Sequence, residues 1–242
     1  MDCTKIYTFN NSYQALTNTT LSRDPGTKLE YSNFGMGLLG QIITLQSNTL
    51  SFHELLSKWI LNILDMNSIA FDLSDEQKSR LAIQHSNSSQ ELPTWKASKP
   101  LTPGTALDST ARDLLKFLSA IIVLMKTKLG DVKKDTQLIR HSTNHLLPND
   151  EPAIFPSNKF DSDTLEFYTG FGWMIITNFG QEIMWHSGST PDGYDSFIAF
   201  NPIKEREVMI LCGVDASHIN ISNIIFKANN SLASLVGTLL TE

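Results

Sequence analysis

Cysteine, positive charge and long apolar runs are all scarce in this chain, and each scarcity argues against a class of protein. The two cysteines, Cys3 and Cys212, lie far apart, form no Cys-x-x-Cys pair and have no metal-ligand partner nearby. Acidic residues outnumber basic ones by 25 to 19, for a formal charge of -6, which argues against a nucleic-acid partner. No apolar stretch is long enough to cross a membrane, and the first residues show no secretory signal pattern.

Apolar residues recur at helical spacing through the first part of the chain. The spacing predicts four helices, over residues 34–45, 51–64, 109–128 and 135–146. Ser51 is the predicted N-cap of the second helix, with Glu54 completing a capping box. Residues 65–105 carry prolines and a glycine that interrupt any long element, so they are interpreted as irregular.

The pattern then changes to aromatic and β-branched runs joined by short links. It predicts strands over residues 167–177, 182–186, 194–201 and 207–214. Strands that follow one another so closely should form an antiparallel meander. A last helix, predicted over 219–240, would pack on this sheet. The sequence therefore predicts an α+β protein with a mainly helical region, 1–164, and a sheet region with a closing helix, 165–242.

The first stretch that could carry chemistry is Tyr31-Ser32-Asn33, which follows the turn signal Pro25-Gly26. In an extended loop, Tyr31 and Asn33 would point to the same side, where a phenol and a carboxamide can share proton handling and substrate holding. The alternative is that the tyrosine anchors the loop and the asparagine caps the next helix. Three glycines at the start of that helix imply close approach of another backbone or a substrate: Gly35, Gly37 and Gly40.

The second stretch is His186-Ser187-Gly188-Ser189, at the end of a predicted strand. Glycine at a strand edge lets a ligand lie against the backbone and hydrogen-bond to it. His186 can donate a proton or hold an anion. The alternative is that a histidine beside Trp185 is a structural residue whose hydrogen bonds are satisfied within the fold.

Together these motifs resemble those of the serine β-lactamase-related family, which includes class C β-lactamases, D-alanyl-D-alanine carboxypeptidases and esterases. Tyr31-Ser32-Asn33, followed by Gly-x-Gly-Leu-Leu-Gly, is similar to the family's second motif. His186-Ser187-Gly188 is similar to the third motif, Lys/His-Ser/Thr-Gly. Three more segments match in the family's order, 106–118, 168–173 and 193–197. Five ordered matches make a bland domain with fortuitous motifs the least favoured interpretation.

The resemblance implies a β-lactamase/transpeptidase-like fold and acyl-enzyme chemistry on a small-molecule or peptide substrate, with no cofactor and no metal. It implies that Tyr31 is the general base or proton relay of a nucleophilic serine, that Asn33 binds the carbonyl side of the substrate, and that His186 lines the opposite wall. Ser187 and Gly188 are then substrate-binding positions. The backbone N–H of Ser189 would match half of the oxyanion hole. Histidine in place of lysine in the third motif favours a peptidase or esterase over a β-lactamase.

The family's nucleophile motif, Ser-x-x-Lys, is absent from this chain, because no serine is followed by lysine three residues later. Gly-x-Ser-x-Gly is absent as well. The family places its nucleophile well before Tyr-x-Asn, and only 30 residues precede Tyr31. We therefore expect the C-terminal portion of a serine hydrolase, inactive as this chain alone. The alternative is a non-catalytic truncated paralogue that binds a ligand or partner in the remaining groove.

The missing segments have structural consequences. Without the family's N-terminal strands, the sheet would have an unpaired edge, through which the chain could self-associate. Without the nucleophile helix, the glycine face of the helix after Tyr31 would lack the partner that it accommodates. The sequence predicts no compartment, because the signal peptide of an exported parent would precede Met1.

Overall fold

The computed structural model describes residues 7–86, 88–105, 107–122, 127, 129, 135–143, 166–178 and 180–213. The chain divides into two compact units. One contains the residues up to 81 together with 94–110, and the other contains 82–93 together with the residues from 111 onward. The boundary predicted between residues 164 and 165 falls outside the described residues and stays a prediction.

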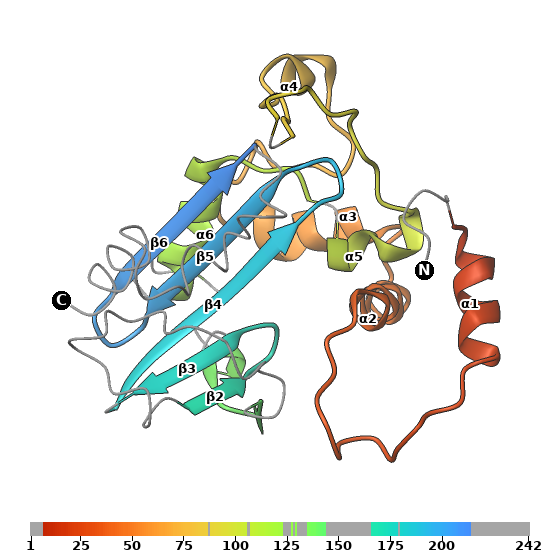
Figure 1. The fold of residues 1–242 in the computed structure, drawn as a ribbon, viewed down its shortest axis with the longest axis vertical. Helices are drawn as coiled ribbons and strands as arrows, with labels where there is room; N and C mark the ends of the chain where they lie inside the picture. Colours follow the sequence, from red (N-terminus) through yellow and green to blue (C-terminus); the bar gives the residue numbers. More distant parts are fainter. Residues whose placement is uncertain are drawn as a thin grey trace. The chain divides into compact units, whose positions relative to one another are not determined.

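The first unit is helical, and most of its helices begin at a serine or threonine N-cap. Its elements are α1 (Phe9–Thr17), α2 (Asn33–Gln46), α3 (Phe52–Leu56), the π-helical turn η1 (Ser57–Leu61), α4 (Asp75–Ser79), the 3-10 turn η2 (Lys99–Leu101) and α5 (Thr102–Thr105) (Figure 1). The helix predicted over 51–64 corresponds to α3 and η1. Its predicted N-cap is confirmed, since the Ser51 hydroxyl accepts from the Glu54 N–H at 3.1 Å. The predicted capping box is not formed, because the Glu54 carboxylate accepts from the Leu50 N–H at 2.8 Å instead of from Ser51.

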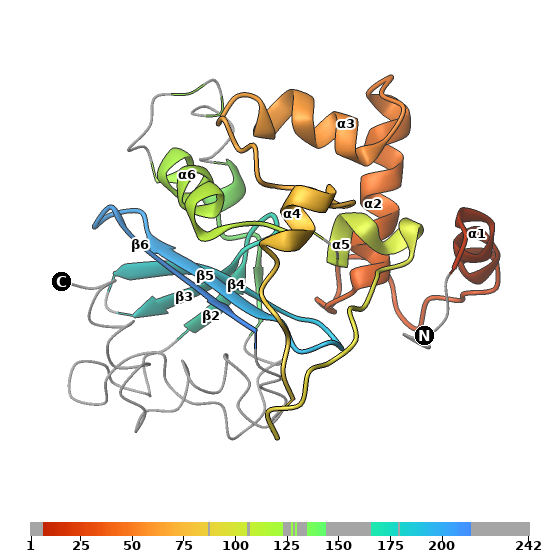
Figure 2. The ribbon, with the colours of Figure 1, turned by 90° about the horizontal axis from the view of Figure 1, so that it is seen from above.

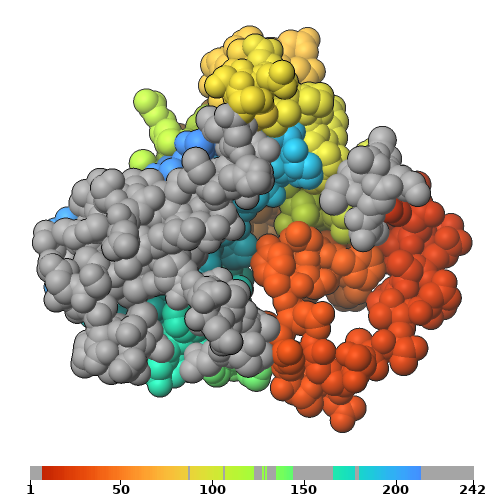
Figure 3. Space-filling model, viewed as in Figure 1, coloured from red at the N-terminus to blue at the C-terminus, as the bar shows by residue number. Residues whose placement is uncertain are grey.

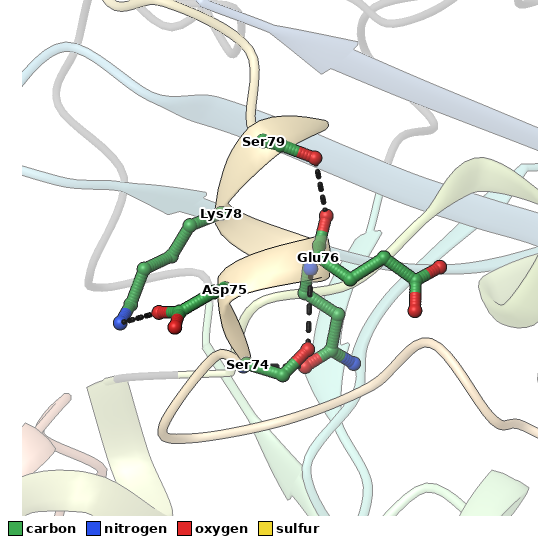
Figure 4. Close-up of polar contacts among 6 residues, drawn as sticks. Ser74, Asp75, Glu76, Lys78 and Ser79 are labelled. Atoms are coloured by element: carbon green, nitrogen blue, oxygen red, sulfur yellow. Dashed lines mark hydrogen bonds and ion pairs between the residues drawn. The ribbon is translucent and has the colours of Figure 1, made fainter.

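Helix α4 lies in the region that the sequence indicated was irregular, and Figure 4 shows what holds it. The Ser74 hydroxyl accepts from the Gln77 N–H at 3.2 Å, and the Gln77 side chain accepts from the Ser74 N–H at 2.9 Å. This reciprocal capping box satisfies two backbone donors at once. The Lys78–Asp75 ion pair, at 3.1 Å, is exposed and contributes little. The prediction missed α4 because a five-residue helix carries no apolar period.

The glycines of α2 let the segment that contains η2 and α5 pack directly on this helix. A Cβ atom at Gly37 would lie 2.5 Å from the Pro100 carbonyl oxygen, and one at Gly40 would lie 2.3 Å from the Pro103 Cβ. The buried Gln41 donates to the same Pro100 oxygen at 3.0 Å. The close approach predicted from these glycines is therefore confirmed. Its partner is this chain's own segment, so the expectation of an empty glycine face is wrong.

The described residues of the second unit form a six-stranded antiparallel sheet in the order β1-β2-β3-β4-β5-β6. The strands are β1 (His141–Ser142), β2 (Glu166–Thr169), β3 (Met174–Asn178), β4 (Gln181–Ser189), β5 (Asp195–Asn201) and β6 (Arg206–Cys212) (Figure 1). The predicted antiparallel meander is confirmed, because each strand pairs with its neighbours in sequence. Within the described part of the chain, β6 pairs with β5 alone.

Two predicted elements are corrected in this unit. The strand predicted over 167–177 is a hairpin of β2 and β3, closed by a bond of 2.8 Å from the Gly170 N–H to the Trp173 oxygen. The aromatic run hid this turn, which only its two glycines signal. Of the helix predicted over 135–146, residues 144–146 lie outside the described part of the chain. Among the described residues of that range, 135–137 are helical, whereas His141 and Ser142 pair with β2.

Helix α6 (Ala111–Ile121) packs on one face of the sheet, as Figure 2 shows. The core between them contains buried apolar residues of both elements: Leu118, Ile121, Ile122, Trp173, Ile175, Met184 and Phe200. The Trp173 and Phe200 rings meet edge to face with centroids 4.9 Å apart. The opposite face also carries buried side chains, including Ile183 and Phe197. The helix predicted over 219–240 and most residues of the third helix beyond 122 lie outside the described residues.

Candidate functional site

The first candidate segment is the start of α2, in the first unit. Ser32 is extended, with φ -150° and ψ 105°, and its hydroxyl accepts from the Gly35 N–H at 2.9 Å. Ser32 is therefore the N-cap, and the alternative that Asn33 caps the helix is wrong. Asn33 already has helical geometry, so the extended-loop argument for a shared side with Tyr31 does not apply either. Both side chains are nevertheless exposed, with Tyr31 at 58%.

The start of α2 is packed on one side and preceded by a loop. Gly104 of α5 lies against it, because a Cβ atom there would be 2.9 Å from the Asn33 carbonyl oxygen. Before it, residues 18–32 form a wide loop that leaves open space between α1 and α2 (Figure 3). Within the loop the predicted Pro25-Gly26 turn is confirmed by a bond of 3.3 Å from the Thr27 N–H to the Asp24 oxygen. Arg23 and Glu30 pair across it. Tyr31 is thus presented by a loop with its own internal contacts.

The second candidate segment is the end of β4, in the second unit, which extends past Met174, the first residue of β3. The β3–β4 ladder runs from the Asn178/Gln181 pair to the Met174/Trp185 pair and stops there. The following residues, 186–189, continue to pair with β5. This end of β4 therefore has a strand on one side only, among the residues that the structure describes. An exposed strand edge of this kind is where an extended ligand can bond to the backbone.

The direction of the Ser189 N–H follows from the ladder. Thr190 donates to the Tyr194 oxygen at 2.9 Å, so this pair is hydrogen-bonded. Bonded and non-bonded pairs alternate along an antiparallel ladder, so the next pair, Ser189/Asp195, is non-bonded. The Ser189 N–H consequently points away from β5, toward the side on which β3 pairs with the earlier residues of β4. A backbone donor needs this orientation to reach the oxygen of a substrate.

His186 is half-buried and bonds to the neighbouring residue of its own strand. Its Nδ1 lies 2.8 Å from the Ser187 carbonyl oxygen. Because a carbonyl oxygen only accepts, the ring proton sits on Nδ1 and the lone pair on Nε2. Burial lowers the pKa of His186 below its usual value of 6.5, and the bond to Ser187 opposes that shift. The neutral imidazole at pH 7 argues against the anion-holding role that the sequence allowed.

Sequence reasoning missed several polar residues around the Ser189 end of β4. The Ser189 hydroxyl donates to the buried carboxylate of Asp195, its partner on β5. Gln84, more than 100 positions earlier, donates to Asp192 in the turn after β4. Asp195 lies in the segment 193–197, which resembles the family, and this resemblance was the one signal in the sequence that could have indicated a role for it. Nothing in the pattern around Gln84 marks it.

Two kinds of feature do not occur in the described residues, a metal-ligand cluster and a membrane-length apolar helix. No group of three or more His, Cys, Asp or Glu side chains there could hold a metal ion. No helix there is both long and apolar enough to cross a membrane. Cys212, on β6, is a half-buried free thiol, and Cys3 lies outside the described residues.

The comparisons with known proteins identify the family. The beta-lactamase family model matches residues 7–218, which is most of the 242 residues of the chain. The chain therefore belongs to the beta-lactamase family, as the resemblance of its motifs predicted.

Among curated relatives, the chain is 25% identical over 242 residues to Protein flp of Staphylococcus aureus (strain N315), covering 94% of this chain and 43% of that protein. It is 27% identical over 192 residues to Beta-lactamase-like protein 4 of Dictyostelium discoideum, covering 76% of this chain and 32% of that protein. The chain thus spans less than half the length of these relatives.

Solved structures confirm the fold. A beta-lactamase/D-alanine carboxypeptidase from Pseudomonas syringae matches with a TM-score of 0.71 at 16% identity, over 91% of this chain and 63% of that one. A class C beta-lactamase from Rhodobacter sphaeroides matches with a TM-score of 0.67 at 17% identity, over 90% of this chain and 66% of that one. The predicted β-lactamase/transpeptidase-like fold, helices with an antiparallel sheet, is therefore confirmed.

Proposed function

We propose that this chain is the C-terminal portion of a serine hydrolase that forms an acyl-enzyme with a β-lactam, a D-Ala-D-Ala peptide or an ester. In this proposal Tyr31 relays the proton of the nucleophile, Asn33 binds the carbonyl side of the substrate, and the Ser189 N–H stabilises the oxyanion. The observation that carries it is the outward N–H of Ser189 at the end of β4, in a chain of this family. One such donor typically lowers the barrier by about 3–4 kcal/mol.

His186 narrows the proposed substrate class. A neutral imidazole with its proton on Nδ1 offers a lone pair at Nε2 and no positive charge. Such a group accepts a proton or a hydrogen bond, and it gives no electrostatic attraction to a carboxylate. We infer that an uncharged ester or amide fits this wall better than the free carboxylate that a β-lactam or a D-Ala-D-Ala peptide carries. Among the proposed substrates, an ester is thus favoured.

We propose further that the chain turns over no substrate by itself, because it carries no Ser-x-x-Lys pair to supply an activated nucleophile. The test is incubation of the purified chain with a chromogenic β-lactam and with a p-nitrophenyl ester. We expect no release of chromophore from either. Turnover that the Tyr31→Phe substitution abolishes would overturn the inactivity and show that another nucleophile serves.

The alternative function is ligand binding without turnover, as a truncated paralogue. The two proposals differ in what lies upstream in the transcript, where a hydrolase must encode a Ser-x-x-Lys helix in frame with Met1. Saturable binding of the ester to the chain, together with an upstream sequence that lacks this motif, would favour the paralogue. An in-frame motif would favour the hydrolase.

A further inference from the structure

The turn that follows the Ser189 end of β4 carries a buried carboxylate at its tip. Residues 190–194 close this turn with bonds from the Thr190 N–H to the Tyr194 oxygen at 2.9 Å and from the Gly193 N–H to the Thr190 oxygen at 3.0 Å. Asp192 at its tip is only 4% exposed. Carboxylates in tight turns are ordinarily solvated, and burying one is costly unless donors meet it. The turn must therefore be held by another part of the chain.

Residues 82–84 hold it from a distance in sequence. The Gln84 Nε2 donates to the Asp192 Oδ2 at 3.3 Å, and Gln84 is itself 4% exposed. The Tyr194 hydroxyl donates to the Ala82 carbonyl oxygen. These two contacts grip the turn on both sides of Gly193, and both lie within the second unit.

The segment that provides this grip is itself fixed. The Leu92 N–H donates to the Gln84 oxygen at 3.0 Å, and the Ser86 N–H donates to the Gln90 oxygen at 2.7 Å, so residues on either side fold back on each other. The His85 N–H donates to the Gly213 oxygen at 2.9 Å, which ties the segment to the residue after β6. The backbone of Gln84 is thus fixed by these hydrogen bonds, while its side chain contacts the turn.

We propose that Gln84 is a positioning residue that, through Asp192, holds the 190–194 turn and thereby sets the orientation of the Ser189 N–H. Thr190/Tyr194 is the first bonded pair after Ser189/Asp195, so any displacement of the turn tilts the end of β4. An oxyanion donor must lie about 2.7–3.1 Å from its oxygen, so a small tilt removes it. The catalytic meaning rests on the proposed function, whereas the holding of the turn does not.

Amide hydrogen exchange measured by NMR on the whole chain tests the proposal. The reporters are the bonded amides of Thr190, Gly193 and Tyr194, and the variant is Gln84→Met, which keeps length and volume but removes the donor. Gln90→Met is the matched control, since Gln90 is exposed on the same segment. We expect these amides to exchange about tenfold faster or more in Gln84→Met, with the control unchanged, because a bond to a charged group has been lost.

Two further variants keep the test decisive should Gln84→Met fail to fold. Asp192→Asn retains an acceptor oxygen for Gln84 and should preserve most of the protection. Tyr194→Phe removes the second contact and should accelerate exchange in the same amides. Equal exchange in Gln84→Met and Gln90→Met would overturn the proposal. Exchange that is accelerated evenly over the β5–β6 ladder in Gln84→Met would overturn it too, because that pattern would mean that Gln84 stabilises the whole unit and not the turn in particular.

A titration with p-nitrophenyl ester links the grip to the site. We expect the ester to shift the Ser189 amide resonance in the wild-type chain and to shift it less in Gln84→Met. An undiminished shift in Gln84→Met would overturn the positioning of Ser189. The absence of any shift in the wild-type chain would count against the proposed function, and the exchange result would then still decide whether Gln84 holds the turn.

Discussion

His186 shows at the scale of one residue how its environment sets its chemistry. Its pKa is lowered by burial, so the folded chain binds this proton more weakly than the unfolded chain does. Below pH 6.5 the unfolded state therefore takes up more protons, and stability is lost as the pH falls. Above that value the neutral ring imposes no penalty. The same burial disfavours the cationic form of His186.

An NMR titration of the histidine side chains checks this prediction. We expect the resonance that is absent from a His186→Gln variant to titrate below 6.5 and to show the Nδ1–H tautomer at neutral pH. The midpoint of thermal unfolding should fall less steeply in the variant than in the wild type as the pH drops from 7 to 5. A titration at or above 6.5 would contradict the inferred neutral role.

Glu207 titrates in the opposite sense. It lies on β6 and accepts from the Ser119 hydroxyl of α6 at 3.1 Å. Burial raises the pKa of Glu207 above its usual 4.5, and the bond to Ser119 opposes this. The folded state therefore retains the proton more strongly, and stability decreases as the pH rises above 4.5 through the raised pKa.

We expect Glu207→Gln to remove that decrease, so that the variant gains stability over the wild type between pH 4 and pH 7. The measurement is urea unfolding at both pH values, with Glu205→Gln at an exposed turn residue as the control. An identical pH dependence in wild type and Glu207→Gln would contradict the raised pKa of Glu207 in the folded state.

At the scale of elements, α6 fixes the sheet of the second unit. Leu118 is completely buried at the centre of their shared core, whereas Leu115 on the same helix is 39% exposed. Leu118→Ala should lower the free energy of unfolding by about 2–5 kcal/mol, because it removes apolar contacts and leaves a cavity. Leu115→Ala should cost well under half of that. Chemical denaturation of both variants is the measurement, and equal losses would contradict the assigned core.

Elements were predictable where one period ran without interruption. The helix that contains Leu118 and the strand that contains Phe197 both followed from their spacing. The β2–β3 hairpin did not, because aromatic residues continue through Gly170 and Gly172, where a local bond from the Gly170 N–H to the Trp173 oxygen closes the turn. Helix α4 depends on a capping box alone. The spacing of apolar residues shows which side of an element is buried. The β2–β3 turn and helix α4 do not depend on burial, so this spacing could not predict them.

The candidate site was predictable to a smaller extent. Tyr31, Asn33 and His186 stood out because the motifs of a known family contain them. The cap at Ser32, the tautomer of His186 and the Gln84–Asp192 contact all depend on where backbone atoms lie in space. A chain position 108 residues away gives no local signal of such a contact. The residues that a motif names could be found, and those that support them could not.

At the scale of the whole molecule, the chain spans 43% of its staphylococcal relative. This partial length matters for the edge strand of the sheet, β6. Within the described residues β6 pairs with β5 alone, and Leu211 on this strand is 45% exposed. An unpaired strand edge offers backbone donors and acceptors to a second copy. We therefore propose that the isolated chain self-associates through β6, as the sequence led us to expect.

Sedimentation velocity over a hundredfold range of concentration measures this association. We expect the mean sedimentation coefficient of the wild-type chain to rise with concentration and Leu211→Lys to suppress the rise, since charge on an edge strand opposes pairing. Ile203→Lys is the matched control, because Ile203 is 66% exposed but lies in the turn between β5 and β6. A wild-type chain that stays monomeric would contradict the proposal. Equal suppression by both lysines would place the contact elsewhere than on the strand edge.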